Sequence, residues 1–304
     1  MGQPFSSQMQ SQRGDRMSLR GSLGRTARLT VVRKAPFGWF LTGAKEEVLL
    51  HINETDREWQ EGEEAEVFLY TDSQGRIAAT TFIPAIQAGT YGWGKVKEVR
   101  EDIGVFVDIG INKDMLLGAE DLPVRKSAWP KPGDWLYITL KVSRNGRIYV
   151  KLASDEVIEE KRNHATRKDF NKNVQGCIYR TAKAGSWVFT FEGYKGFIHE
   201  SQRGKEPRLG EKVDGRIIDV KEDGTVNISL LPRKHESMAD DAERIYSYLL
   251  ERNGAMPYSD KSPPEDIRAR FGMSKGAFKR ALGKLMKEGK VYQEGMWTYA
   301  VKKE

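Results

Sequence analysis

One pattern of short apolar segments occurs three times in a row, and it limits the folds that this chain can adopt. Each copy centres on a glycine corner that opens an aromatic strand, within APFGWFLTG (35–43), EDIGVFVDIG (101–110) and KAGSWVFTFEG (183–193). A strand-like run precedes each corner, and two more runs and a polar glycine hairpin with a last strand follow it. Five short strands that recur about every 65–75 residues predict small closed barrels, because closure removes exposed sheet edges.

The three copies define the predicted domains. We expect all-β barrels over 23–84, 88–154 and 173–232. The stretch 155–172 is highly charged, which predicts a solvated linker helix between the second and third barrels. Residues 1–22 are polar, rich in Ser, Gln and Arg, and lack the apolar core of a secretory signal, so we expect a disordered tail.

The apolar period changes to that of helices in the last segment, 238–304. Ser262, Pro263 at the first helical position and Glu265 predict a helix that starts with a capping box. The last two runs, KVYQ and MWTYAV, flank Glu294-Gly295 and predict a β-hairpin. Three helices and a hairpin together predict a small α+β winged helix-turn-helix domain. The helical stretches are 240–254, 262–272 and 275–289.

Composition narrows the classes of function. Cys177 is the one cysteine, which excludes a disulfide framework and a cysteine-rich zinc site, and its apolar neighbours predict a buried thiol. No run approaches the ~20 apolar residues of a membrane span, so we expect a cytoplasmic protein without a membrane partner. The net charge of +7 favours a polyanionic partner.

The third copy raises the question whether its rings fill a core or face solvent. Strand side chains alternate between faces, so Phe189 is expected to follow Trp187 to the outside, and Phe197 and His199 share a face on the next strand. Exposed rings stack unpaired bases while nearby cations meet the phosphates, whereas the same alternation also fits rings in a core. We predict the exposed arrangement, with Lys195, Arg203 and Lys205 at the rim.

The first copy resembles the S1-type RNA-binding domain, a five-stranded OB-fold barrel. Its Phe37 and Phe40 match the two aromatic positions of the second strand, His51 matches the histidine of the third, and Arg76 matches the arginine of the late hairpin. The resemblance implies that these four residues bind RNA. The chain as a whole is then a multidomain protein of tandem S1-type barrels and a winged helix.

The other two copies depart from this family pattern. The third has Ala184 in place of the first ring and Thr225 in place of the hairpin arginine. The second keeps Phe106 and Arg147, which the resemblance also implies for RNA binding, but Gly118 replaces the histidine. The second copy therefore keeps only part of the family's set of binding residues.

The order of three such domains and a terminal winged helix is similar to that of the conserved virulence factor B family of bacterial regulators. The resemblance covers residues from about 20 to the end of the chain. It implies single-stranded RNA binding and post-transcriptional control of gene expression, including virulence.

The last predicted helix is strongly basic along one side. Phe278 and Leu282 belong to its apolar side, together with Met286. The cations are either a solvated face of a core helix or a surface for the nucleic-acid backbone, with little base readout because Asn and Gln are absent. They are Lys275, Lys279, Arg280, Lys284 and Lys287.

Two other functions compete with RNA binding. A DNA-binding transcription regulator would act mainly through the winged helix, and DNA therefore stays open as a partner. A nuclease would need a carboxylate cluster that holds a metal, or a histidine pair. The four histidines are scattered and no phosphate-binding loop occurs, so we expect no enzyme activity, no cofactor and no metal.

Overall fold

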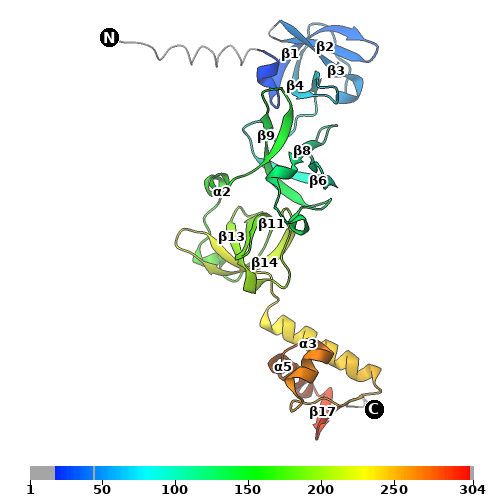
Figure 1. Ribbon diagram of the computed structural model, residues 1–304, viewed down its shortest axis with the longest axis vertical. Helices are drawn as coiled ribbons and strands as arrows, with labels where there is room; N and C mark the ends of the chain where they lie inside the picture. The colour runs from blue at the N-terminus through cyan, green and yellow to red at the C-terminus, as the bar shows by residue number, and fades with distance from the viewer. Residues whose placement is uncertain (1–17, 44, 302–304) are drawn as a thin grey trace, which may run out of the picture. The chain divides into compact units, whose positions relative to one another are not determined.

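The computed structural model describes residues 18–43 and 45–301, in two compact units that divide at Leu230 (Figure 1). Most of the expected tail, 1–17, lies outside the described residues. Residues 18–22, also assigned to the tail, are instead folded against the first barrel. Leu19, in the turn before the first strand, is only 4% exposed and belongs to the barrel core.

The first repeat is a closed five-stranded barrel with the strand order β1-β2-β3-β5-β4. A parallel pair between β3 and β5 closes it, at Leu49 and Ala78. Gly38 opens β2 with φ +148°, and a Cβ there would lie 2.2 Å from the carbonyl oxygen of Leu50, so the corner needs glycine. The strands are Thr26–Ala35, Gly38–Gly43, Glu46–His51, Glu64–Thr71 and Ile77–Thr80.

The third repeat is a second closed barrel with the same order, β11-β12-β13-β15-β14. Its closing parallel pair joins Gly196 of β13 to Val226 of β15. The two barrels therefore have equivalent positions throughout. The strands are Asn173–Ala182, Gly185–Thr190, Lys195–His199, Lys212–Val220 and Val226–Ser229.

The second repeat has five strands, but its sheet is open, with the order β10-β9-β6-β7-β8. The prediction of a third closed barrel is therefore wrong. The strands that correspond to the closing parallel pair of the barrels are β8 and β10, whose residues are all described, and no hydrogen-bonded pairing joins them. The strands are Gly92–Arg100, Gly104–Asp108, Met115–Gly118, Trp135–Val142 and Ile148–Leu152.

The segment between the second and third repeats is not a solvated helix. Only α2, Asp155–Lys161, is α-helical, and a short 3-10 turn, Arg167–Asp169, follows it. Ile158 of α2 is fully buried, in a cluster that includes Tyr179 and Phe189 of the third barrel. The helix therefore packs against this barrel.

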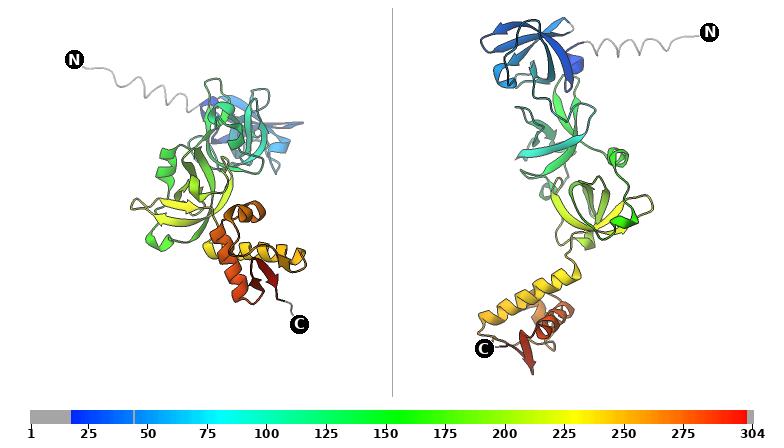
Figure 2. Two further views of the ribbon diagram at one scale, coloured as in Figure 1. Left: turned by 60° about the horizontal axis from the view of Figure 1, so that its bottom comes forward. Right: turned by 180° about the vertical axis from the view of Figure 1, so that it is seen from behind.

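The second unit has the order of a winged helix: three helices, then the β17–β18 hairpin, with β16 added to its edge. Figure 2 shows the helices in yellow to orange beside the short sheet in red. Phe278 and Leu282 of α5 lie in the core that joins them. The elements are α3 (Lys234–Glu251), β16 (Ala255–Met256), α4 (Pro264–Phe271), α5 (Lys275–Lys287), β17 (Val291–Glu294) and β18 (Trp297–Ala300).

Two local predictions in this unit are wrong. Helix α4 starts at Pro264, and Ser262 Oγ accepts a hydrogen bond from the Ser259 N–H at 2.9 Å, so it closes the preceding turn and caps no helix. The hairpin turn is Gly295-Met296, one residue later than expected, because Glu294 pairs with Trp297. Among the described residues, no helix is long and apolar enough to cross a membrane.

Candidate nucleic-acid interface

An arginine covers the central ring of each closed barrel. A bulge in the first strand places Arg33 opposite Phe40 in one barrel, and the same bulge places Arg180 opposite Trp187 in the other. The guanidinium carbons lie 3.5 Å and 3.7 Å from the ring centroids, which is cation–π contact. Neither arginine was predicted from the sequence, although each stands seven residues before its ring.

The middle sheet has a carboxylate at this position. Its bulge places Glu98 opposite Phe106, and Arg100 lies farther along the strand. The Arg100 carbon is 5.1 Å from the Phe106 centroid, and its Nε forms an ion pair of 2.8 Å with Glu98. Arg100 is thus paired with the carboxylate that lies opposite the ring. Arg33 and Arg180 also have ion pairs, with Glu47 at 3.0 Å and Asp155 at 3.9 Å, but in the barrels the residue opposite the ring is the arginine itself.

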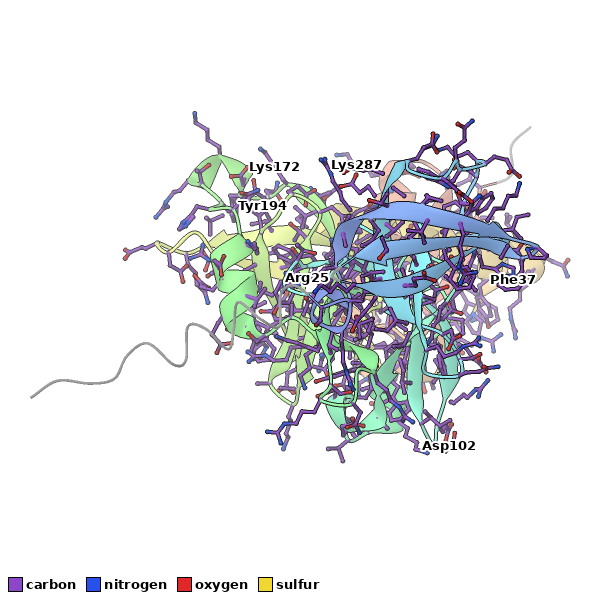
Figure 3. The ribbon with its side chains drawn as sticks, turned by 90° about the horizontal axis from the view of Figure 1, so that it is seen from above. Arg25, Phe37, Asp102, Lys172, Tyr194 and Lys287 are labelled. Carbon is purple, nitrogen blue, oxygen red and sulfur yellow. The ribbon has the colours of Figure 1, made fainter. Side chains whose placement is uncertain are left out.

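The ring face of the first barrel is open at its hairpin end. Phe37 lies at the tip of the β1–β2 hairpin and is 47% exposed (Figure 3). Phe40 is half-buried, and the two rings meet edge to face with centroids 6.3 Å apart. Trp39 points inward, and its Nε1–H donates to the Trp59 carbonyl at 2.9 Å. Strand alternation thus places Phe40 on the outer ring face and Trp39 in the core.

The third barrel carries a row of three rings on the equivalent strands. Trp187 and Phe197 pair across β12 and β13, with centroids 4.9 Å apart, and both are half-buried. His199 is exposed, with its ring 6.4 Å from that of Phe197. Trp187, Phe197 and His199 therefore lie together on one face, as expected for three of the four residues of the predicted platform.

Phe189 is a correction to that prediction, because it is only 5% exposed. It does share a face with Trp187, but the middle sheet covers that end of the face. The Phe189 centroid lies 6.1 Å from that of Trp93 and 5.2 Å from that of Tyr137. The neighbouring Phe191, left unassigned from the sequence, is 52% exposed at the edge of this cluster.

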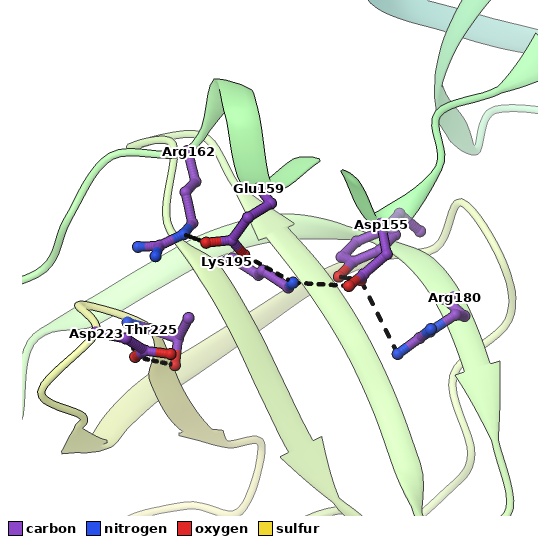
Figure 4. A network of polar contacts seen from close by, with 8 residues as sticks. Asp155, Glu159, Arg162, Arg180, Lys195, Asp223 and Thr225 are labelled. Atoms are coloured by element: carbon purple, nitrogen blue, oxygen red, sulfur yellow. Dashed lines mark hydrogen bonds and ion pairs between the residues drawn. The ribbon is translucent and has the colours of Figure 1, made fainter. Parts of the chain in front are cut away.

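Lys195 is a second correction. Its Nζ forms ion pairs of 2.8 Å with Asp155 and 2.9 Å with Glu159 of α2, and its side chain is only 15% exposed (Figure 4). Burial alone would lower the pKa of Lys195, but the hydrogen bonds to the two carboxylates outweigh it and raise the pKa. Lys195 is therefore occupied within the protein and is unsuited to a phosphate contact.

Arg203 is likewise partly engaged, since its Nη1 donates to Ser186 Oγ at 2.5 Å. The half-buried guanidinium is tied to the strand that carries Trp187.

His51 and His199 occupy equivalent positions in the two barrels and make the same local hydrogen bond. His51 pairs with Gly38 and His199 with Gly185 in the strand registers. In each, Nδ1 accepts from the backbone N–H two residues later at 3.2 Å. The neutral ring must therefore carry its proton on Nε2, which leaves an N–H donor for a ligand. The middle sheet has Gly118 at this position, opposite Gly104.

The late hairpins differ among the repeats as the sequence predicted. Equivalent turn hydrogen bonds align Arg76 with Arg147 and with Thr225. Arg76 is exposed and forms an ion pair of 2.7 Å with Asp72. Burial acts to raise the pKa of Asp72, but its hydrogen bonds with Arg76 outweigh this and lower the pKa.

A hollow in the first barrel adjoins these polar groups. His51 and Arg76 line it together with Glu54, Tyr70 and Asn112. Burial, and then the neighbouring Glu54 carboxylate, raise the pKa of the Tyr70 hydroxyl. The hollow therefore brings His51 and Arg76 together with further hydrogen-bonding groups.

The cations of α5 lie along the outside of the second unit. Lys279, Arg280 and Lys287 are exposed, and Lys275 and Lys284 are half-buried. Two of them have weak ion pairs, Lys279 with Asp260 at 3.8 Å and Lys284 with Glu288 at 3.9 Å. Met286, predicted on the buried side, is 40% exposed. Its position near the end of the helix takes it beyond the core.

Family models match most of the chain. The model described as an S1 domain matches residues 23–82, and that of the CvfB first S1-like domain matches 91–151. The second domain of the virulence regulatory factor CvfB matches 158–232, and the CvfB-like winged helix domain matches 243–299.

Individual proteins are similar over most of their length. The YitL protein of Bacillus subtilis is 51% identical over 92% of this chain and 94% of its own. Conserved virulence factor B of Staphylococcus aureus is 41% identical over 77% of this chain and 78% of its own. A crystal structure of a multidomain protein with nucleic acid binding domains from Streptococcus pneumoniae is 37% identical, with a TM-score of 0.65, over 92% of this chain and 99% of that one.

Proposed function

Because this chain belongs to the CvfB family of S1-like and winged-helix proteins, we propose that it is a non-enzymatic regulator that binds single-stranded RNA. The domains that the family models match are nucleic-acid-binding domains, and RNA is the specific partner proposed here. Post-transcriptional control of bacterial genes in the cytoplasm completes the proposal.

The observation that carries the proposal is the arginine-covered ring in both closed barrels. The planar guanidinium of Arg33 or Arg180 can stack on a base or meet a phosphate, and the ring beneath it holds the guanidinium in place. Phe37 and Phe197 extend the platforms, and the His199 ring lies beside Phe197. His51 occupies the position in the first barrel that is equivalent to His199. Unpaired bases, which expose flat faces, fit this chemistry better than a closed duplex does.

The full set of proposed contacts follows from this arrangement. Phe189 and Lys195 are left out, because both are occupied within the protein. Phe106 and Arg147 of the middle sheet are assigned a minor part, since Glu98 repels phosphates beside the ring. Arg33 and Arg180 join the set because they cover the central rings. The remaining residues are Phe37, Phe40, His51, Arg76, Trp187, Phe197, His199 and Arg203, with Lys275, Lys279, Arg280, Lys284 and Lys287 holding the backbone.

A competition assay tests the proposal against the DNA-binding alternative. A labelled single-stranded RNA bound to the full chain is displaced with unlabelled RNA of the same sequence or with duplex DNA. We expect RNA to compete at much lower concentration, because only unpaired bases can reach the rings. Stronger competition by duplex DNA would favour a transcription regulator that acts through the winged helix.

A further inference from the structure

Three aromatic side chains form a row on the outer face of the β16-β18-β17 sheet. Tyr292 pairs with Tyr299 across the hairpin, and Trp297 lies two residues before Tyr299 on the same strand. The Tyr292 and Tyr299 centroids are 5.3 Å apart with planes at 23°, and those of Trp297 and Tyr299 are 6.3 Å apart with planes at 21°. The three nearly parallel rings are called the wing stack below.

The wing stack is open to solvent at both ends. Tyr292 is 50% exposed and Trp297 is 44% exposed, whereas their strand neighbours Val291 and Thr298 point into the unit and are buried. A cross-strand aromatic pair stabilises a hairpin, which accounts for Tyr292 and Tyr299. Trp297 extends the row beyond that pair, and the faces of both end rings can receive another flat group.

The chain that leads into the wing stack is basic, and this charge indicates what kind of flat group the rings receive. Helix α5, Lys275–Lys287, carries five cations and no carboxylate, and the chain turns at Gly289 directly into β17. Lys287 at its end is exposed, and Glu294 is the one carboxylate on the outer face of the hairpin. A polyanion with flat groups, which is a single-stranded nucleic acid, complements this pairing of rings and cations.

We propose that the wing stack is a further binding site for unpaired nucleobases, with the cations of α5 holding the phosphates of the same strand. The choice of RNA as that strand rests on the proposed function. In this arrangement the hairpin of the winged helix contacts the bases of a single strand. Helix α5 contacts the phosphates and does not enter the groove of a duplex. The sequence offered a signal for this, since Tyr292, Trp297 and Tyr299 alternate with inward residues.

Crosslinking locates the contact. Single-stranded RNA that contains 5-iodouridine is irradiated with the full-length protein, and the modified peptides are mapped. We expect crosslinks within 291–301 in addition to those in the barrels. Crosslinks confined to the barrels and α5 would overturn the inference and leave the proposed function standing, whereas no crosslink to any of these parts would count against both.

Affinity measurements test whether the rings act through bases. In the full chain, Tyr292→Ala with Trp297→Ala should weaken binding of single-stranded RNA by at least about fivefold, the lower end of base–aromatic stacking. Tyr292→Phe with Trp297→Phe should retain the wild-type affinity. An oligomer of the same backbone without bases should bind the alanine variant and the wild type equally.

Leu250→Ala is the matched control, because Leu250 is 52% exposed on α3 and outside the wing stack. The thermal transition of each variant checks that the unit folds. The inference would be overturned if Leu250→Ala lowered the RNA affinity as much as the wing variant does. It would also be overturned if the wing variant lost duplex affinity to the same extent, or if the wild type self-associated and the alanine variant did not. If the wing variants keep their affinity while Trp187→Ala lowers it, the wing inference fails and the barrel proposal stands.

Discussion

The closed barrels and the middle sheet share one strand pattern and one bulge, yet they place opposite charges beside the central ring. Arg33 and Arg180 lie over their rings, whereas Glu98 occupies the equivalent position beside Phe106. The middle sheet also has Gly118 where the barrels have a histidine. An aromatic strand by itself is therefore a poor guide to a binding face, and the residue across from the ring is a better one.

The largest expected effect comes from removing the central rings of both barrels. Phe40→Ala with Trp187→Ala should lower the affinity for single-stranded RNA by at least about tenfold, because each ring holds the arginine that stacks on a base and each such stack contributes about 1–3 kcal/mol. Fluorescence anisotropy with a labelled oligonucleotide measures it. Phe106→Ala is the matched control and should change the affinity little. Equal losses in both proteins would remove the distinction between barrels and middle sheet.

Reversing the charge at Glu98 should make the middle sheet bind RNA more as the closed barrels do. Glu98→Arg places a cation opposite Phe106 and releases Arg100 from its ion pair, so RNA affinity should rise about threefold to tenfold. Glu98→Gln removes only the negative charge and should give a smaller gain. An unchanged affinity in Glu98→Arg would show that the open sheet, and not the charge, prevents binding.

The basic helix should affect salt dependence more than specificity. Lys279→Ala with Lys284→Ala should reduce the slope of log affinity against log salt by about 1.4, at about 0.7 for each phosphate contact on a single strand. A salt titration of binding measures the slope. Lys261→Ala, an exposed cation outside α5, serves as the control. If the double variant keeps the wild-type slope, α5 makes no backbone contact.

A substitution of Lys195, in the third barrel, should have the smallest effect on RNA affinity. Lys195→Met should leave RNA affinity unchanged, because its Nζ is held by Asp155 and Glu159. It should lower the free energy of unfolding by about 1 kcal/mol, a modest value because both carboxylates are partly exposed to solvent. Denaturant unfolding measures the loss, and weaker RNA binding would contradict the assignment.

The same ion pairs predict a pH dependence. Burial acts to raise the pKa of Asp155, but hydrogen bonds with Lys195 and Tyr179 outweigh it and lower the pKa. The resulting stability is present above the unfolded pKa of about 3.9 and is lost as the pH falls through the folded value. Lys195→Met should therefore lose less stability on acidification than the wild type does.

Much of the fold could be predicted from the sequence, because its signals are local. Strand alternation and glycine hairpins specified the repeats, and helical spacing specified the winged helix. That β8 and β10 of the middle sheet stay unpaired concerns strands far apart in the chain, which the pattern of single strands does not reveal. The start of α4 depends on Ser262, whose hydroxyl serves the turn before the helix.

The ring platforms were predictable only in part. Alternation placed Phe189 on the correct face, but not the neighbouring sheet that covers it. Lys195 stands in an ordinary position for a rim cation, and its partners come from a helix 36 and 40 residues away in the chain. Arg33 and Arg180 depend on a bulge that shifts the register, which alternation with a strict period of two misses.

The aromatic seam around Phe189 has a consequence for how this part of the chain melts. Trp93 and Tyr137 of the middle sheet share one apolar cluster with Phe189 and with Ile158 of α2. If either the middle sheet or the third barrel unfolds, aromatic rings of the other become exposed to water. The two should therefore unfold in one cooperative step. The middle sheet, which has Glu98 opposite its own ring, therefore stabilises the third barrel by packing against it.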